Sequence, residues 1–168
     1  MSKSMTHKES AIFSNPIDFI EETISEEDWA YHRIGPKEIA FEIPGRWGDY
    51  RLQFVWQDDM KILQLFAILD MQATDKNLPS LYELLSIINA RLPLGHFEIS
   101  HDDGMPTYRN SLLHLNARNL TTEYLEDIVD IAVIECERFY PAFQFVIWGG
   151  KSAKEAADVA LLETQGEA

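Results

Sequence analysis

The clearest structural signal in the sequence is the stretch IAFEIPGRWGDYRLQFVWQ, residues 39–57. Apolar and polar residues alternate at both of its ends, which is the period of a half-buried β-strand. Between the two runs, residues 44–49 supply a turn rich in proline and glycine. The stretch therefore predicts an antiparallel hairpin whose inward residues are Ile39, Phe41, Ile43, Tyr50, Leu52, Phe54 and Trp56.

The next apolar run, KILQLFAIL at residues 61–69, differs because neither of its alternating sets is consistently polar. A strand that is apolar on both faces has to be covered twice. The helices of the domain provide one cover, and either another helix or a second subunit is expected to provide the other.

Helices are expected before, between and after these strands, and helix-capping residues mark their starts. These residues are Asn15 with Pro16, Ser80 with Glu83, Thr121 or Thr122, and Ser152 with Glu155. Pro141 is expected to interrupt or restart the third helix, because proline lacks the N–H group that a helical hydrogen bond needs.

A second hairpin is expected between the second and third helices, in HFEISH and PTYRNSLLHL. With Asp103 and Gly104 as a two-residue turn, Glu98 lies opposite Arg109 as a cross-strand ion pair. The same register places Phe97 and Ile99 on one face with Tyr108, Asn110 and Leu112.

The order of elements, α-β(3-4)-α-β(2)-α-α, predicts an α+β fold in which helices back an antiparallel β-sheet. We expect one domain over residues 14–162, with flexible tails at 1–13 and 163–168. A chain of 168 residues with 46% hydrophobic content can bury a sizeable core.

The net charge of the chain limits the classes of partner that it is expected to bind. With 28 acidic and 14 basic residues, the net charge is −14. Such a chain repels phosphate backbones and anionic membranes, so neither nucleic acid nor membrane is an expected partner. The acidic excess serves solubility or docks a basic partner, and the composition leaves both open.

The compartment is expected to be the cytoplasm. Cys136 is the single cysteine, which excludes an intrachain disulfide, and it lies in an apolar helical stripe as a buried thiol. The first ten residues lack the apolar core of a signal peptide, and no apolar run is long enough to span a bilayer.

The ending of a phosphate-binding loop occurs at Gly150, Lys151 and Ser152. That motif also needs a glycine at the position of Phe145 and a buried strand before it. Both are missing from the pattern, which instead predicts a helix, a Gly149–Gly150 stop and a capped second helix.

No catalytic, metal or cofactor site is expected. His96, His101 and His114 belong to the second hairpin, but the predicted register places them too far apart or on opposite faces for one zinc ion. No glycine-flanked nucleophile is present, and a buried Cys136 is unreactive. The chain is therefore predicted not to be an enzyme.

Apolar and aromatic side chains point instead to an interaction surface. Trp47 lies in a glycine-bounded turn beside Arg46, where the strand pattern does not require it. Trp56 and Trp148 are assigned to the core. The candidate surface residues are Arg46, Trp47, Ile62, Phe66, Ile68 and Tyr108.

The sequence resembles the YbjN family, a bacterial group related by fold to type III secretion chaperones. The matching phrases are IAFEIPGRWGDYRLQFVW, GMPTYRNSLLHL, LTTEYLEDIVDIAVIECERFYPAF and GGKSAKEA. The resemblance implies a type III secretion chaperone-like α+β domain that is often dimeric, and a regulatory role in sensory or stress responses without established chemistry.

We therefore expect a non-catalytic cytoplasmic protein-binding module, chaperone-like or regulatory, that forms a homodimer and binds a protein partner. The alternative is a small-molecule sensor with a pocket between sheet and helices, lined by Trp47, Trp56 and Tyr108. No cofactor is expected in either case.

Overall fold

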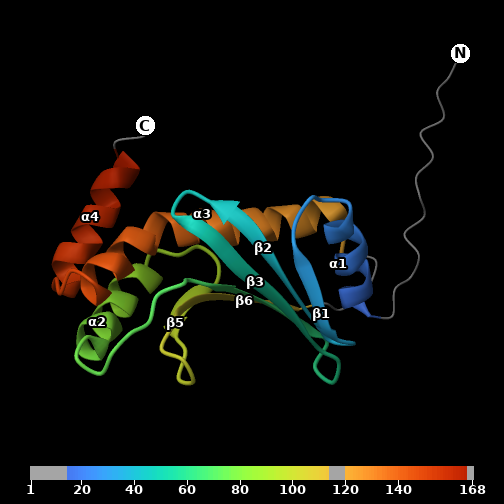
Figure 1. Cartoon of the computed structure of the whole chain (residues 1–168), viewed down its shortest axis with the longest axis horizontal. Helices are drawn as coiled ribbons and strands as arrows, with labels where there is room; N and C mark the ends of the chain where they lie inside the picture. Colours follow the sequence, from blue (N-terminus) through green and yellow to red (C-terminus); the bar gives the residue numbers. More distant parts are fainter. Residues whose placement is uncertain (1–14, 114–119, 166–168) are drawn as a thin grey trace, which may run out of the picture.

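In the computed structural model, which describes residues 15–113 and 120–165, one antiparallel sheet has the strand order β1-β2-β3-β4-β6-β5 (Figure 1). The strands are β1 (Tyr31–Gly35), β2 (Glu38–Gly45), β3 (Gly48–Gln57), β4 (Ile62–Ile68), β5 (His96–Ile99) and β6 (Pro106–Leu113). The helices are α1 (Pro16–Ser25), α2 (Leu78–Asn89), α3 (Thr122–Ile147) and α4 (Ala153–Gln165). This arrangement confirms the α+β class and the predicted order of elements.

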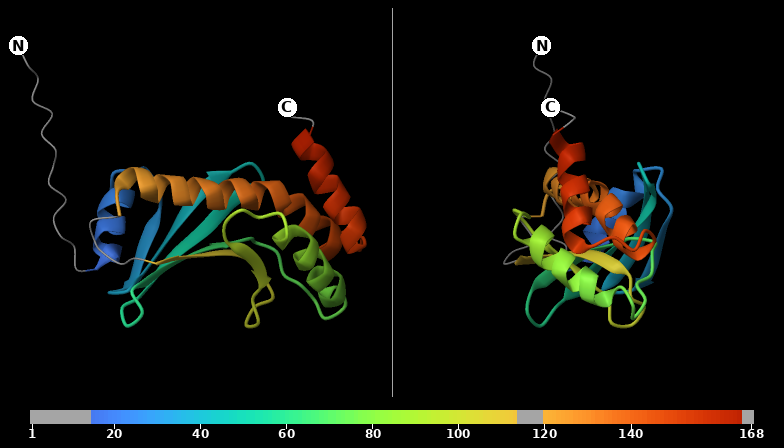
Figure 2. Two further views of the ribbon diagram at one scale, coloured as in Figure 1. Left: turned by 180° about the vertical axis from the view of Figure 1, so that it is seen from behind. Right: turned by 90° about the vertical axis from the view of Figure 1, so that its left-hand side faces the viewer.

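The helices cover one face of the sheet. Figure 2 shows α1 and α3 on the same side of an arched sheet, while the turns that follow β3 and β5 project away from α3. At one end, α2 contacts the edge strand β5, and α4 packs against α2 and α3. The opposite face of the sheet has no helix of the described chain over it.

The core lies between the sheet and α3, and aromatic rings fill its centre. Phe41 stacks on Trp29 and on Phe54, with ring centroids 5.7 and 5.9 Å apart. Phe97 packs against Tyr108, Phe139 and Phe143 at 5.2–5.8 Å. Every inward residue of the first hairpin is buried, as the alternation predicted.

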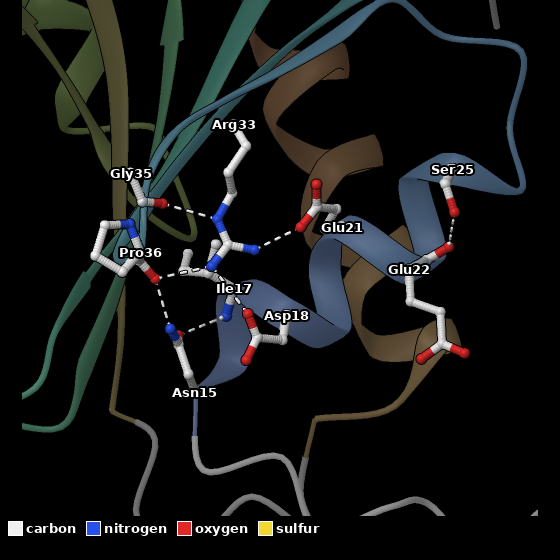
Figure 3. Close-up of polar contacts among 9 residues, drawn as sticks. All are labelled: Asn15, Ile17, Asp18, Glu21, Glu22, Ser25, Arg33, Gly35 and Pro36. Atoms are coloured by element: carbon white, nitrogen blue, oxygen red, sulfur yellow. Dashed lines mark hydrogen bonds and ion pairs between the residues drawn. The ribbon is translucent and has the colours of Figure 1, made fainter.

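An arginine clamp attaches α1 to the turn between β1 and β2 (Figure 3). The Arg33 guanidinium lies 2.5 Å from Glu21 Oε2 and 2.9 Å from Asp18 Oδ1, both on α1. It also donates to the carbonyl oxygens of Gly35 (2.7 Å) and Pro36 (3.0 Å). The Asn15 side chain caps α1 by accepting the N–H of Ile17, which confirms that predicted start.

Helix α3 continues through Pro141 rather than breaking there. Proline has no N–H to donate to the carbonyl four residues earlier, which belongs to Glu137. The Trp47 indole Nε1 donates to that carbonyl oxygen at 3.3 Å. The turn between β2 and β3 thus supplies the donor that the helix lacks, and the helix is extended across the proline.

The turn between α3 and α4 has the predicted helix, Gly-Gly, helix arrangement. Gly150 takes a positive φ of 60°, which favours glycine. The Ser152 hydroxyl accepts the Glu155 N–H at 3.2 Å and donates to the Glu155 carboxylate at 3.1 Å. Ser152 is therefore confirmed as the residue that caps the start of α4, and Glu155 is bonded to its hydroxyl.

The register predicted for the β5–β6 hairpin is wrong by two residues. Phe97 pairs with Tyr108 and Glu98 with Thr107, so the loop spans four residues, 101–104. Gly104 adopts a φ of 72° at its last position, and the Asp103 carboxylate accepts the Met105 N–H. Because a shift of two preserves alternation, the predicted face set is still correct.

Two predicted boundaries also differ. Helix α2 begins at Leu78, so Ser80 lies inside its first turn; Pro79 fits there because its missing N–H costs nothing at that position. Helix α4 reaches Gln165, three residues into the expected tail at 163–168. The expected tail at 1–13 lies outside the described residues.

Candidate interaction surface

The uncovered face of the sheet carries rows of side chains that follow from strand pairing. In one row Gln53 lies opposite Phe66, and Phe66 lies opposite Arg109. The row on one side contains Arg51, Ile68, Thr107 and Glu98. The row on the other contains Glu38, Val55, Gln64 and Ser111.

Apolar side chains occupy the middle of this face. Val55, Phe66 and Ile68 are half-buried, although no helix of the described residues lies over them. They line a hollow of about 600 Å³ that extends from Glu38 on β2 to the β5–β6 loop. We call these residues and the hollow the open-face site. Exposed apolar surface in a concave region is typical of a binding surface.

A polar ladder fixes one side of the open-face site. The Gln57 amide donates to Gln64 Oε1 at 2.7 Å, and the Gln64 amide donates to Ser111 Oγ at 3.2 Å. Gln64 is only 6% exposed, so these hydrogen bonds offset the cost of burying its amide. The ladder crosses three strands and holds this side of the surface in one arrangement.

Carboxylates surround the apolar floor. Glu98 lies 3.6 Å from the Arg109 guanidinium and 3.1 Å from His96 Nε2. Arg109 in turn lies 5.3 Å above the centre of the Phe66 ring. The carboxylates of Glu38, Asp102 and Asp103 also line the hollow, and none of the three forms an ion pair within residues 15–113 and 120–165.

The structure brings together three of the six candidate surface residues. Ile62, Phe66 and Ile68 share the uncovered face of β4. Arg46 and Trp47 lie at the opposite side of the sheet, where Trp47 stacks on Tyr140 of α3 with centroids 5.9 Å apart. The Arg46 N–H donates to the Glu137 carboxylate at 2.8 Å.

Tyr108 was placed wrongly among the surface residues, because it is fully buried and its hydroxyl donates to the Leu94 carbonyl oxygen. It lies on the inward face with Phe97, as its alternation with Arg109 indicates. Trp148 shows the opposite difference from its prediction: it was assigned to the core, but 59% of it is exposed.

Sequence reasoning missed Val55 and the acidic residues of the β5–β6 loop. Val55 is the one apolar residue among the polar outward residues of β3, and this exception could have indicated that it belongs to a binding surface. Asp102 and Asp103 could be assigned to a turn. Only the fold places that turn beside β4.

The buried titratable groups lie away from the open-face site. Burial raises the pKa of the Cys136 thiol, with smaller effects from Glu135 and Glu137, so the thiolate is disfavoured. Burial also raises the pKa of Tyr108 to about 12. Among the described residues, no three His, Cys, Asp or Glu side chains are grouped to hold a metal ion. His114 lies outside them.

No helix within residues 15–113 and 120–165 is long and apolar enough to cross a membrane.

Comparison with solved structures places the fold among known ones. No curated protein gives a significant match. A chain of the ExsC–ExsE complex is 14% identical, with a TM-score of 0.48 over 73% of this chain and 92% of that chain. The crystal structure of YbjN from E. coli, described as "a putative transcription regulator", is also 14% identical, with a TM-score of 0.52 over 74% of this chain and 88% of that chain.

The family comparison covers most of the chain. The model of the family YbjN, described as "Putative bacterial sensory transduction regulator", matches residues 16–145. This range runs from the start of α1 almost to the end of α3, and it includes the whole sheet. The chain belongs to the YbjN family.

Proposed function

We propose that the chain is a non-catalytic protein-binding module with a regulatory or chaperone-like role, and that it holds a segment of a partner protein on the open-face site. The observation that carries this function is the half-buried cluster of Val55, Phe66 and Ile68 around a hollow. Covering these side chains contributes about 25 cal/mol per Å² of apolar area removed from water.

The surrounding groups favour binding over chemistry. The floor offers aliphatic and aromatic carbon, and the rim offers carboxylates and amides that form hydrogen bonds. Apolar contacts surrounded by polar groups are typical of protein interfaces. The cytoplasm is part of this proposal, in keeping with a single cysteine held as a buried thiol.

Site-specific photocrosslinking in cells tests the function. A photoreactive phenylalanine analogue at Phe66 is expected to form covalent adducts with a partner protein. The matched control carries the same group at Tyr82 on α2, which is 55% exposed. Equal adduct patterns from the two positions, or none from position 66, would contradict a partner on this face.

We extend the proposal to a homodimer formed at β1. This strand is an edge of the sheet and exposes Tyr31 (43%) and Ile34 (46%), although α1 also contacts it. An edge strand with exposed apolar side chains is prone to pair with another strand. Light scattering after size exclusion is expected to give a dimer mass, and Ile34→Lys is expected to give a monomer. A native monomer would contradict it.

The small-molecule sensor remains the second candidate, with a different location. Tyr108 and Trp56 fill the interior between sheet and helices, whereas the volume of the open-face hollow is within the usual range for ligand sites. A thermal-shift screen of metabolites tests it, because a ligand at a hundred times its Kd adds about 2.7 kcal/mol of stability. A hit abolished by Ile68→Ser would favour a sensor.

A further inference from the structure

On the basis of the proposed function, we infer that the open-face site selects a basic segment, one in which lysine or arginine residues flank an apolar residue. Charge complementarity between the carboxylates around the hollow and the segment favours this occupant.

The hollow presents three carboxylates that form no ion pair among the described residues. Glu98 is paired with Arg109, but Glu38, Asp102 and Asp103 have no cationic partner in the described part of the chain. Glu38 accepts a hydrogen bond from the Gln53 amide, which leaves its negative charge in place. Among the described residues, His101 is the one basic side chain that lines the hollow, and Arg109 lies beside it over the Phe66 ring. Ammonium and guanidinium groups meeting these carboxylates would form charge-assisted hydrogen bonds at a partly shielded surface.

The arrangement of the carboxylates sets the pattern of the partner. Glu38 projects from β2, and Asp102 and Asp103 follow β5; these strands are four spacings apart in the sheet order. Four spacings amount to about 19 Å across the strands, and the register places Glu98 four residues, about 13 Å, from the row of Glu38 along them. The two acidic ends are therefore at least about 23 Å apart, roughly seven residues of extended chain or more. Val55, Phe66 and Ile68 lie on β3 and β4, between the two acidic ends. A fitting segment therefore has a basic residue, then an apolar one, then a second basic residue within about eight positions.

Other classes of ligand fit less well. Nucleic acid is repelled by the carboxylates and by the net charge of −14. A free polyamine satisfies the carboxylates but leaves Phe66 and Ile68 without a bulky apolar group. A basic protein segment satisfies both the rim and the floor.

Fluorescence anisotropy with synthetic peptides tests the selection. The probe is a labelled peptide of about twelve residues with a central leucine and a lysine on each side, about four residues away. Replacing leucine by serine, or both lysines by glutamate, is expected to weaken binding about tenfold or more.

The variant Glu38→Gln/Asp102→Asn/Asp103→Asn is expected to weaken binding of the basic peptide about tenfold, since three interactions near 0.5 kcal/mol each combine to that factor. Asparagine at 103 keeps the acceptor for the Met105 N–H. The matched control, Glu126→Gln/Asp127→Asn/Asp130→Asn, makes the same charge change on exposed positions of α3. It is expected to change affinity by less than about twofold. Equal losses in both variants would overturn a specific site.

Val55→Thr separates the failure of this inference from failure of the proposed function, because the replacement keeps the shape and the strand propensity. If peptides with and without lysine bind equally and V55T weakens both, the face binds proteins but the basic preference is wrong. If no peptide binds and Phe66 gives no crosslinks, the proposed function itself fails. Displacement of the peptide by spermidine at lower concentration than by unlabelled peptide would identify a polyamine site and overturn the inference.

Discussion

Glu135 is an acidic residue inside the core. Its side chain is 9% exposed, and Oε2 accepts no hydrogen bond, although Arg138 Nη1 lies 3.6 Å away. Burial raises the pKa of this carboxyl, and the opposite effect of Arg138 is smaller. The folded protein therefore holds the Glu135 proton more tightly than the unfolded chain does.

A carboxyl with a raised folded-state pKa contributes stability below its unfolded pKa, and that stability is lost as the pH rises through the folded value. Glu135→Gln is expected to be about 1 kcal/mol more stable than the native chain at pH 7 and equal to it near pH 4. Urea unfolding across this range measures the difference, with exposed Glu123→Gln as control. Lower stability of E135Q at pH 7 would show that the Arg138 pair outweighs burial.

The hairpin formed by β2 and β3 is coupled to α3 through Trp47 and Pro141. Trp47→Phe keeps an aromatic ring on Tyr140 but removes the donor to the Glu137 carbonyl, and is expected to cost about 1 kcal/mol of unfolding free energy. In Pro141→Ala the helix regains its own N–H, so the same change is expected to cost clearly less. Denaturant unfolding of the four proteins measures this coupling.

The control for this double-mutant cycle, which compares Trp47→Phe in the native chain and in Pro141→Ala, is Trp148→Phe. Trp148 is suitable because it is 59% exposed at the end of α3. It is expected to change stability by less than about 0.5 kcal/mol in both backgrounds. An equal cost of W47F with and without Pro141 would contradict replacement of the helical donor by the indole.

Helix α1 depends on Arg33 for its attachment to the sheet. Arg33→Met removes two ion pairs and two hydrogen bonds to carbonyl oxygens, and is expected to cost about 1 kcal/mol. Amides of α1 are expected to lose more protection from hydrogen exchange than amides of α3. Lys151→Met is the control, since its pair with Glu155 is long and exposed. Equal loss of protection in both helices would contradict a local clamp.

Elements whose signals are local could be predicted from the sequence, whereas registers could not. The first hairpin followed from alternation because each inward residue is buried. In the second, Gly104 fits both a two-residue turn and the end of a four-residue loop. A contact outside the hairpin contributes to the second arrangement: the Ala73 N–H donates to the Gly104 carbonyl at 2.9 Å, and a strand-by-strand argument has no access to it.

The net charge of −14 opposes the compact state of the protein through repulsion between like charges. Added NaCl is expected to raise the thermal midpoint, because ions screen repulsion among the carboxylates. Calorimetry in NaCl and in KCl measures the trend, and agreement between the salts excludes binding of one ion. A midpoint that falls with salt would show that attractive pairs such as those of Arg33 dominate.

The open-face site could be predicted only in part from the sequence, because some of its expected residues are placed by contacts between elements. The two-sided pattern of β4 indicated an uncovered apolar face, and Phe66 and Ile68 are on it. Tyr108 and Trp47 were expected with them, yet Tyr108 donates to Leu94, 14 positions earlier, and Trp47 donates to Glu137, 90 positions later. The partner of Tyr108 lies just before β5 and comes close through the hairpin register, and that of Trp47 becomes a neighbour only when α3 is placed on the sheet.

The hydrogen bond from Trp47 to Glu137 also bears on the order of folding. It joins residues 90 positions apart, so it forms only after a long loop has closed. Closing such a loop costs chain entropy, and contacts of this sequence separation slow folding. Until the hairpin tip arrives, the Glu137 carbonyl receives no hydrogen bond from Trp47, and α3 lacks this support where it crosses Pro141. Tryptophan emission from the tip would therefore follow a late step of refolding, after the strands have paired.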